Sequence, residues 1–261
     1  MMKASGDRFL TLAALLATGA IICMPALFLV EPPAPASYPY LAASFVIHQG
    51  YFVLLLQAYR FGDLSQVYPL ARGLGPLLVT GFALIVAGEW PSTFGLAGIV
   101  MVSGGIASLS LAGRTRQASD AKAVIYAVAT GIFIALYMTA DGLGVRNAGP
   151  SSFGYIFWLI FLTSIPVCIG AVLFRARDLR VFLKTDWKSG LGGGVLAIGA
   201  YGVAMYALGQ GPMGHVVALR ETAVLFGTLI GAYRLNETLG PKRIAAAAAI
   251  MAGLVLLQIG G

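Results

Sequence analysis

Nine apolar segments, each long enough to cross a lipid bilayer, dominate the sequence and leave room for few other folds. They cover residues 9–30, 39–59, 64–88, 94–112, 122–145, 152–174, 189–209, 213–233 and 243–260. Only short stretches of charged or turn-forming residues separate them. Because roughly 20 helical residues cross a bilayer core about 30 Å thick, the pattern predicts an all-α, polytopic membrane protein with no extramembrane domain.

The composition argues against a soluble protein of any class. Hydrophobic residues make up 59% of the chain and charged residues 10%, whereas about a quarter of a soluble domain is charged. The net charge of +7 does not indicate a nucleic-acid partner, because the basic residues lie in the breaks between apolar segments. Two isolated cysteines, Cys23 and Cys168, and two histidines without ligand companions predict neither a disulfide framework nor a metal site. We expect no catalytic residues and no cofactor.

The lysines and arginines predict how the chain crosses the membrane. If the segments alternate in direction, fourteen basic residues in the breaks fall on one side, and only Arg146 falls on the other. Cytoplasmic loops carry the positive charge in membrane proteins. The sequence therefore predicts a multi-pass protein of the inner (plasma) membrane, with a cytoplasmic N-terminus and an outward-facing C-terminus.

A shift of 148 residues reveals an internal repeat. It superposes Arg72 on Arg220 and Glu89 on Glu237, so each half has an arginine within an apolar segment and a glutamate seventeen residues later. We interpret residues 1–118 as a first repeat with four helices and residues 119–261 as a second with five. A five-helix unit repeated after an odd number of crossings is inverted, which predicts a ten-helix architecture with one helix missing.

The missing helix leaves three explanations open. By the repeat spacing, it would lie some 24 to 28 residues before Met1. A start codon placed too late, a shortened protein and a version that works with nine helices all fit this pattern. The DNA just upstream of the codon for Met1 distinguishes between them.

One arginine interrupts the third apolar segment between two prolines. The sequence there is Tyr68-Pro69-Leu70-Ala71-Arg72-Gly73-Leu74-Gly75-Pro76. A charged side chain at the bilayer centre costs roughly 2.5–3.5 kcal/mol on insertion scales, so Arg72 should face protein or a polar cavity. The helix-breaking residues are Pro69, Gly73, Gly75 and Pro76, and they predict a break with a gating role. We expect Arg72 and Tyr68 to bind solute.

The second repeat has its own pair of charged residues, Arg220 and Glu221. In the functional interpretation, Arg72 and Arg220 attract an anionic group while Glu221 takes a proton or a cation. The alternative is an internal hydrogen-bond network that locks helices together. Adjacent helical residues point about 100° apart, so Glu221 does not automatically neutralise Arg220 and is expected to face another helix or water.

Aromatic and ionisable residues on other segments complete the candidate site. Tyr51 and Tyr201 are related by the repeat at a slightly larger shift, and His48 shares a helix face with Tyr51. We predict that these three residues bind solute as well. Asp141 is a candidate for proton coupling, and its alternatives are solvation or a pair with Arg146.

Several sequence motifs resemble a known family. They are Gly88-Glu89-Trp90, Leu235-Asn236-Glu237-Thr238-Leu239-Gly240, the stretch from Tyr59 to Gly73, and Ala218-Leu219-Arg220-Glu221-Thr222. They resemble the EamA-type transporters of the drug/metabolite transporter superfamily. The resemblance implies a ten-helix fold of two inverted five-helix repeats that moves small organic metabolites through a central cavity. Our hypothesis is a secondary transporter that works by alternating access and is driven by an ion or solute gradient. The chain departs from this family in lacking the first helix, and its charges place the C-terminus outside.

Two other functions stay open alongside the transporter. A non-transporting membrane assembly subunit fits a chain with a missing helix. An intramembrane enzyme acting on lipid would need a nucleophile–base pair or a metal cluster at membrane depth, and the sequence offers neither. The expected partners are the lipid bilayer and an anionic or zwitterionic small-molecule solute, and a homodimer is left open.

The charge pattern makes a testable prediction about topology. A reporter enzyme that is active only in the cytoplasm should be inactive when fused after Gly261, because the C-terminus is expected outside. The same reporter fused after residue 117, in a basic break, should be active and serves as the control. Activity of the C-terminal fusion would contradict the predicted orientation.

Overall fold

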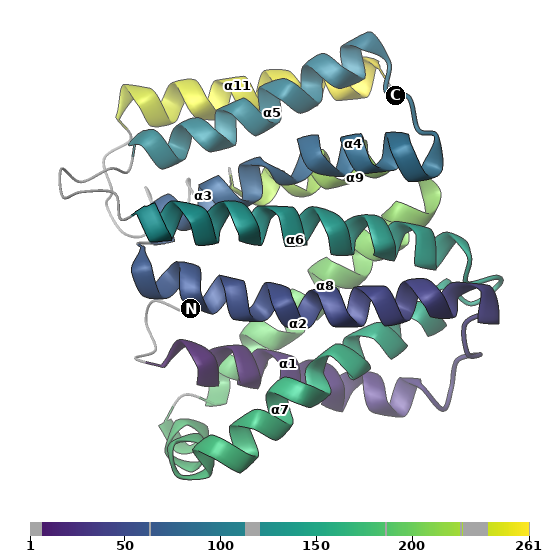
Figure 1. The fold of residues 1–261 in the computed structure, drawn as a ribbon, viewed down its shortest axis with the longest axis vertical. Coiled ribbons are helices and arrows are strands. Elements are labelled where there is room, and N and C mark those ends of the chain that lie inside the picture. The colour runs from purple at the N-terminus through teal and green to yellow at the C-terminus, as the bar shows by residue number, and fades with distance from the viewer. Residues whose placement is uncertain are drawn as a thin grey trace. The chain divides into compact units, whose positions relative to one another are not determined.

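The structure, a computed structural model, describes residues 7–62, 64–112, 121–185, 187–224, 226 and 240–260, and most of them are helical (Figure 1). The helices are α1 (Arg8–Ala26), α2 (Tyr38–Phe61), α3 (Leu64–Gly73), α4 (Gly75–Ala87), α5 (Thr93–Ala112), α6 (Ala121–Arg146), α7 (Ser152–Thr185), α8 (Trp187–Gln210), α9 (Met213–Arg220) and α11 (Pro241–Ile259). A short 3-10 helix, Pro35–Ser37, precedes α2. The described part of the chain contains no strand.

Six stretches are long and apolar enough to cross a membrane. They are Arg8–Ala26, Pro35–Phe61, Val67–Ala87, Ala121–Arg146, Ser152–Phe182 and Gly190–Gln210. Two shorter apolar helices, Thr93–Leu109 and Ile244–Ile259, lie within α5 and α11. These helices confirm the predicted all-α, polytopic membrane fold.

Where predicted and observed helix bounds differ, the cause is local. The segment predicted over 9–30 ends as a helix at Ala26, directly after Pro25, which lacks the N–H of a helical hydrogen bond. The segment predicted over 152–174 continues as α7 to Thr185, with non-helical backbone angles at Arg175. The segment predicted over 213–233 begins with α9, but residues 227–239, including Glu237, lie outside the described residues.

The helices form two compact units, and each unit draws on both halves of the sequence. Unit 1 consists of Met1–Gln49 and Ala140–Gln210. Within it, α1 packs against α7 and α8. Glycines of α8 allow a close approach to α1, because a Cβ at Gly190 would lie 2.8 Å from the Cβ of Ala14. The start of α8 therefore packs closely against α1 at Gly190.

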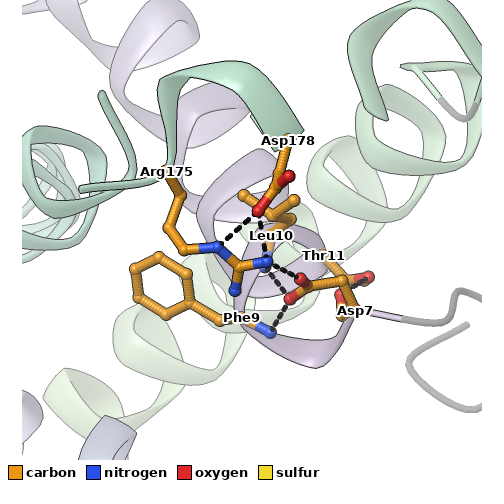
Figure 2. Close-up of polar contacts among 6 residues, drawn as sticks. All are labelled: Asp7, Phe9, Leu10, Thr11, Arg175 and Asp178. Atoms are coloured by element: carbon orange, nitrogen blue, oxygen red, sulfur yellow. Dashed lines mark hydrogen bonds and ion pairs between the residues drawn. The ribbon is translucent and has the colours of Figure 1, made fainter. Parts of the chain in front are cut away.

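A carboxylate–arginine cluster joins the start of α1 to the bend in α7 (Figure 2). Oδ1 of Asp7 caps α1 by accepting hydrogen bonds from the backbone N–H groups of Phe9 and Leu10, each at 3.1 Å. Oδ2 of Asp7 pairs with Nη2 of Arg175 at 2.5 Å. The same guanidinium donates to Oδ2 of Asp178 from Nε at 2.8 Å and from Nη2 at 2.7 Å. Arg175 therefore holds two carboxylates at the residue where α7 departs from helical geometry.

Unit 2 consists of Gly50–Thr139 and Gly211–Gly261, and its closest helix pair is α5 with α11 (Figure 1). A Cβ added at Gly98 would lie 2.6 Å from the backbone O of Gly253, and one added at Gly253 would lie 2.8 Å from the backbone O of Gly98. Farther along, a Cβ at Gly105 would lie 3.0 Å from the backbone O of Ala246. The shift of 148 maps Gly98 onto Ala246 and Gly105 onto Gly253, so it exchanges the two contacts. Such reciprocity is what a two-fold axis produces.

One further pair of repeat-equivalent helices also packs together, namely α1 with α7 in unit 1. In unit 2, α4 packs against α9, which the shift of 148 pairs with α3. Equivalent helices meet in this way when two repeats are related by a two-fold axis, so the packing supports the predicted inverted repeat. The predicted boundary between residues 118 and 119 lies outside the described residues, and the division into 1–118 and 119–261 stays a prediction.

A glycine-to-alanine substitution, which adds a single methyl group, tests the glycine contact between α5 and α11. We expect Gly98→Ala to lower the free energy of unfolding by about 1–3 kcal/mol, because the added Cβ meets backbone atoms that cannot rotate away. Thermal unfolding of the purified protein in detergent measures this loss. Gly104→Ala on the same helix is the matched control, since a Cβ there meets nothing within 4 Å. Equal stability of the two variants would show that the helices are not held this closely.

Candidate functional site

The helix that carries Arg72 is interrupted directly after it. α3 ends at Gly73, Leu74 forms a turn, and α4 begins at Gly75 with Pro76 in its first turn. Pro76 has no N–H to donate to the carbonyl of Arg72, four residues earlier, which weakens the helix at this point. Pro69, by contrast, lies inside α3, which continues through it.

Glycines hold this break tightly between neighbouring helices of unit 2. A Cβ at Gly73 would lie 3.0 Å from the backbone N of Ala107 in α5. A Cβ at Gly131 of α6 would lie 2.8 Å from the backbone O of Ala71. The backbone around Arg72 therefore lies close to the backbones of α5 and α6. This close packing holds the Cα atom of Arg72 in position.

Arg72 forms a two-point ion pair with Glu221. Nη2 of Arg72 lies 2.7 Å from Oε1 of Glu221, and Nε donates to Oε2 at 3.0 Å. The two side chains are 14% and 3% exposed. The ring of Tyr68 lies beside the guanidinium, with its centroid 5.8 Å from Cζ. The sequence-based hypothesis assigned Arg72 to an anionic solute and Glu221 to a proton or cation, whereas in the structure the two residues bind each other.

Glu221 reaches Arg72 because α9 ends just before it. α9 stops at Arg220, and Glu221 caps the helix in a turn before helical residues resume at Thr222. Each predicted repeat therefore contributes an interrupted helix to the ion pair, with the interruptions at Leu74 and Glu221. Interrupted helices that present charged groups are typical of transporter binding sites.

Arg220 and Tyr51 lie in the same unit as the ion pair. Nη1 of Arg220 lies 3.2 Å from the sulfur of Met138. The ring of Tyr51 packs against Tyr137 in a T-shaped arrangement, with centroids 5.3 Å apart. Tyr51 also interacts electrostatically with both Arg72 and Arg220. Five predicted binding residues, Arg72, Tyr68, Glu221, Arg220 and Tyr51, thus belong to unit 2.

The other three predicted residues, His48, Asp141 and Tyr201, form a buried polar cluster in unit 1. Asp141 is 0% exposed, and its carboxylate accepts hydrogen bonds from the hydroxyl of Tyr201 at 2.5 Å and from the hydroxyl of Ser44. Nδ1 of His48 lies 3.1 Å from Oγ of Ser44. Nε2 of His48 lies 3.4 Å from the hydroxyl of Tyr201. Asp141 is therefore buried rather than solvated. Nε of Arg146 donates to the backbone O of Leu208.

Tyr155 of α7 completes the surroundings of this cluster. Its side chain is fully buried, and its hydroxyl has no hydrogen-bond partner in the described part of the chain. The ring rests against Gly144, where any Cβ would collide with the hydroxyl. Tyr155 also interacts electrostatically with Asp141. The hydroxyl of Tyr155 thus interacts with the buried carboxylate of Asp141 without donating a hydrogen bond to any described residue.

Sequence reasoning missed Ser44 and Tyr155 as members of the site. Ser44 lies one helical turn before His48, so the i, i+4 spacing was a signal for the contact between them. Nothing in the local sequence of α7 distinguishes Tyr155 from an ordinary core tyrosine. Glu89 accepts a hydrogen bond at 2.7 Å from the backbone N–H of Met213, the first residue of α9.

The described residues do not form the side-chain groups that bind metal ions. They contain no group of three or more His, Cys, Asp or Glu side chains that could hold a metal ion. Both cysteines are free thiols in the apolar interior or at its edge. Each unit therefore has its own set of polar side chains, an Arg72–Glu221 ion pair in unit 2 and a histidine–carboxylate cluster in unit 1.

Charged side chains at interrupted helices inside a polytopic helical bundle are features of membrane transporters. The chain belongs to the EamA-like transporter family, whose family model matches residues 121–259, more than half of its length. This match confirms the resemblance seen in the sequence. The family consists of membrane transporters rather than enzymes.

A comparison with solved structures supports the same fold. One crystal structure, titled only "Crystal structure of protein", matches with a TM-score of 0.74 over 98% of this chain and 90% of that chain. Its sequence is 18% identical, so the likeness shows the fold alone. No curated protein matches this sequence.

The buried ion pair makes a prediction about stability. We expect Arg72→Met or Glu221→Leu alone to cost about 3–5 kcal/mol of unfolding free energy, because each leaves an unpaired buried charge. The double variant should cost less than either single variant, since it removes both charges. Denaturant unfolding in detergent measures all three. Asp178→Asn, in a pair that is largely exposed, is the control and should change stability by less than about 1 kcal/mol.

Proposed function

We propose that this protein is a secondary transporter that moves a small organic solute across the inner (plasma) membrane by alternating access. Membership of the EamA-like transporter family supports transport in general. The observation that carries the finer proposal is the Arg72–Glu221 ion pair, in which the two predicted repeats meet through interrupted helices. Such a contact can break and re-form as the repeats move.

The charges of this pair suggest the chemistry of the solute. A carboxylate on the solute can replace Glu221 at the Arg72 guanidinium, and a solute ammonium group can replace Arg72 at Glu221. A solute with both groups satisfies both side chains, whereas one with a single charge leaves a buried partner unpaired. We therefore propose an anionic or, by this charge balance, preferably zwitterionic solute. Tyr51, Tyr68 and Arg220 would contact its remaining surface.

The remaining parts of the proposal concern movement and energy. Gly73, Gly75 and Pro76 flank the interruption after Arg72, with Pro69 one turn before it, and they would serve as the gate. The sequence has no phosphate-binding loop, so an ion gradient or the solute's own gradient would drive transport. The protein would work in lipid with its N-terminus in the cytoplasm and its C-terminus outside, as a monomer or a homodimer.

Flux through reconstituted vesicles tests this function. Purified protein in liposomes should exchange labelled solutes from a panel of amino acids, organic anions and organic amines, with a zwitterion transported fastest. Arg72→Ala should lower that flux at least tenfold, because the guanidinium contacts the solute directly. Arg177→Ala, an exposed arginine on α7, is the matched control and should keep wild-type flux. If Arg72→Ala keeps both solute binding and flux, the proposed binding site is wrong.

A further inference from the structure

Asp141, Ser44, His48 and Tyr201 of unit 1 form a ring of close polar contacts. One carboxylate oxygen accepts from the hydroxyl of Ser44, whose oxygen lies 3.1 Å from Nδ1 of His48. The other accepts from the hydroxyl of Tyr201 at 2.5 Å, and the oxygen of Tyr201 lies 3.4 Å from Nε2 of the same imidazole. Both oxygens of the acid are thus linked to both nitrogens of the base through two hydroxyl groups.

The direction of these hydrogen bonds determines where protons lie. Nδ1 of His48 is 2.9 Å from the backbone carbonyl O of Ser44, and a carbonyl only accepts, so Nδ1 carries a hydrogen. The hydroxyls of Ser44 and Tyr201 each have one hydrogen, and both hydrogens are donated to the carboxylate. The oxygen of Tyr201 therefore faces Nε2 as an acceptor.

A proton on Nε2 of His48 would satisfy every contact in the ring. In the neutral imidazole, the lone pair of Nε2 faces the oxygen lone pairs of Tyr201, and the separation of 3.4 Å is long for a hydrogen bond. Adding a proton turns Nε2 into a donor toward Tyr201. The proton comes from a hydronium ion, whose O–H bond breaks as the N–H bond forms, and the formal charge of the ring changes from −1 to 0. A neutral ring is also cheaper to keep inside an apolar bundle.

Two further titratable groups belong to the surroundings of the ring. α7 contributes the hydroxyl of Tyr155, which is without a hydrogen-bond partner among the described residues and interacts electrostatically with Asp141. α1 contributes the thiol of Cys23, which belongs to the same apolar core as Tyr155 and Tyr201. His48 is 6% exposed and Ser44 is 0% exposed, whereas Tyr201 is partly exposed. Tyr201 is therefore the most exposed member of the ring.

We infer that His48 and Asp141, bridged by Ser44 and Tyr201, form a proton-binding site that supplies the coupling ion for transport. The coupling role rests on the proposed transport function, whereas the binding of the proton does not. His48 takes up the proton, Asp141 balances its charge, and Tyr201 relays it from water. Each transport cycle would load one proton at this ring.

Histidine NMR tests proton binding without a known solute. The chain has only two histidines, so uniform 15N-histidine labelling gives two imidazole signals, and His48→Gln assigns them. We expect His48 to reach a form with both nitrogens protonated in a single step. Asp141→Asn should require at least a tenfold higher proton concentration for half-protonation, and Tyr201→Phe at least threefold. His215 serves as an internal monitor of folding in each sample.

Matched controls separate this ring from general effects of substitution. Asp178→Asn removes an exposed carboxylate, and Tyr206→Phe removes the hydroxyl of another tyrosine on α8, so neither should alter the titration of His48. If His48 never becomes doubly protonated above pH 5, or titrates identically in Asp141→Asn and Tyr201→Phe, the site does not exist.

Vesicle assays distinguish this inference from the proposed function. Solute exchange with equal pH on both sides reports transport alone, and accumulation driven by a pH gradient reports proton coupling. Exchange without pH-driven accumulation would overturn the coupling role and leave transport standing. Titration of His48 without any exchange would overturn transport and leave the proton site standing. The expected result is exchange in wild type, with pH-driven accumulation reduced at least tenfold in Asp141→Asn.

Discussion

A buried charge inside an apolar helical bundle is stable only when an opposite charge pairs with it. In unit 2, Arg72 and Glu221 form such a pair. The guanidinium of Arg72 leaves its helix where α3 gives way to α4, and the carboxylate of Glu221 leaves the chain where α9 ends. Both groups lose hydration in this position, and the two-point contact at 2.7 and 3.0 Å replaces water as their partner. The interruptions are what bring these side chains together, since each lies at or beside one of the contributing residues.

The repeats are alike in packing but unlike in charge. The glycine contacts of α5 and α11 exchange under the shift of 148 residues, as symmetric contacts must. The same shift turns the Arg72–Glu221 pair into Arg220 and Gly73, which cannot form an ion pair. Arg220 instead has the sulfur of Met138 at 3.2 Å. The packing of α5 against α11 therefore follows the pseudo-symmetry, while the charged residues depart from it.

The sequence predicted the features that depend on neighbouring residues, such as helices and their interruptions. It did not predict contacts between residues that lie far apart in the sequence. Segment lengths and apolar composition predicted the fold class, and glycines with a proline predicted the interruption after Arg72. Arg72 and Glu221, however, are far apart in the sequence, and no periodicity indicates that they pair. The end of α7 was missed because its charged residues resemble a loop, whereas Asp7 and Asp178 neutralise Arg175 there. The ring around Asp141 combines three helices, and only its His48–Ser44 edge is local in sequence.

The α5–α11 pair also restricts how the protein can move. Sliding one helix along another requires a surface that accepts more than one register, as larger interlocking side chains can. Here backbone lies against backbone at Gly98, Gly105 and Gly253, so a shift by one helical turn would bring bulkier residues into spaces that admit no Cβ. This pair has a single register. The two helices are therefore expected to move together as one rigid element. Any rearrangement within unit 2 then occurs at other contacts, most easily at the interrupted helices.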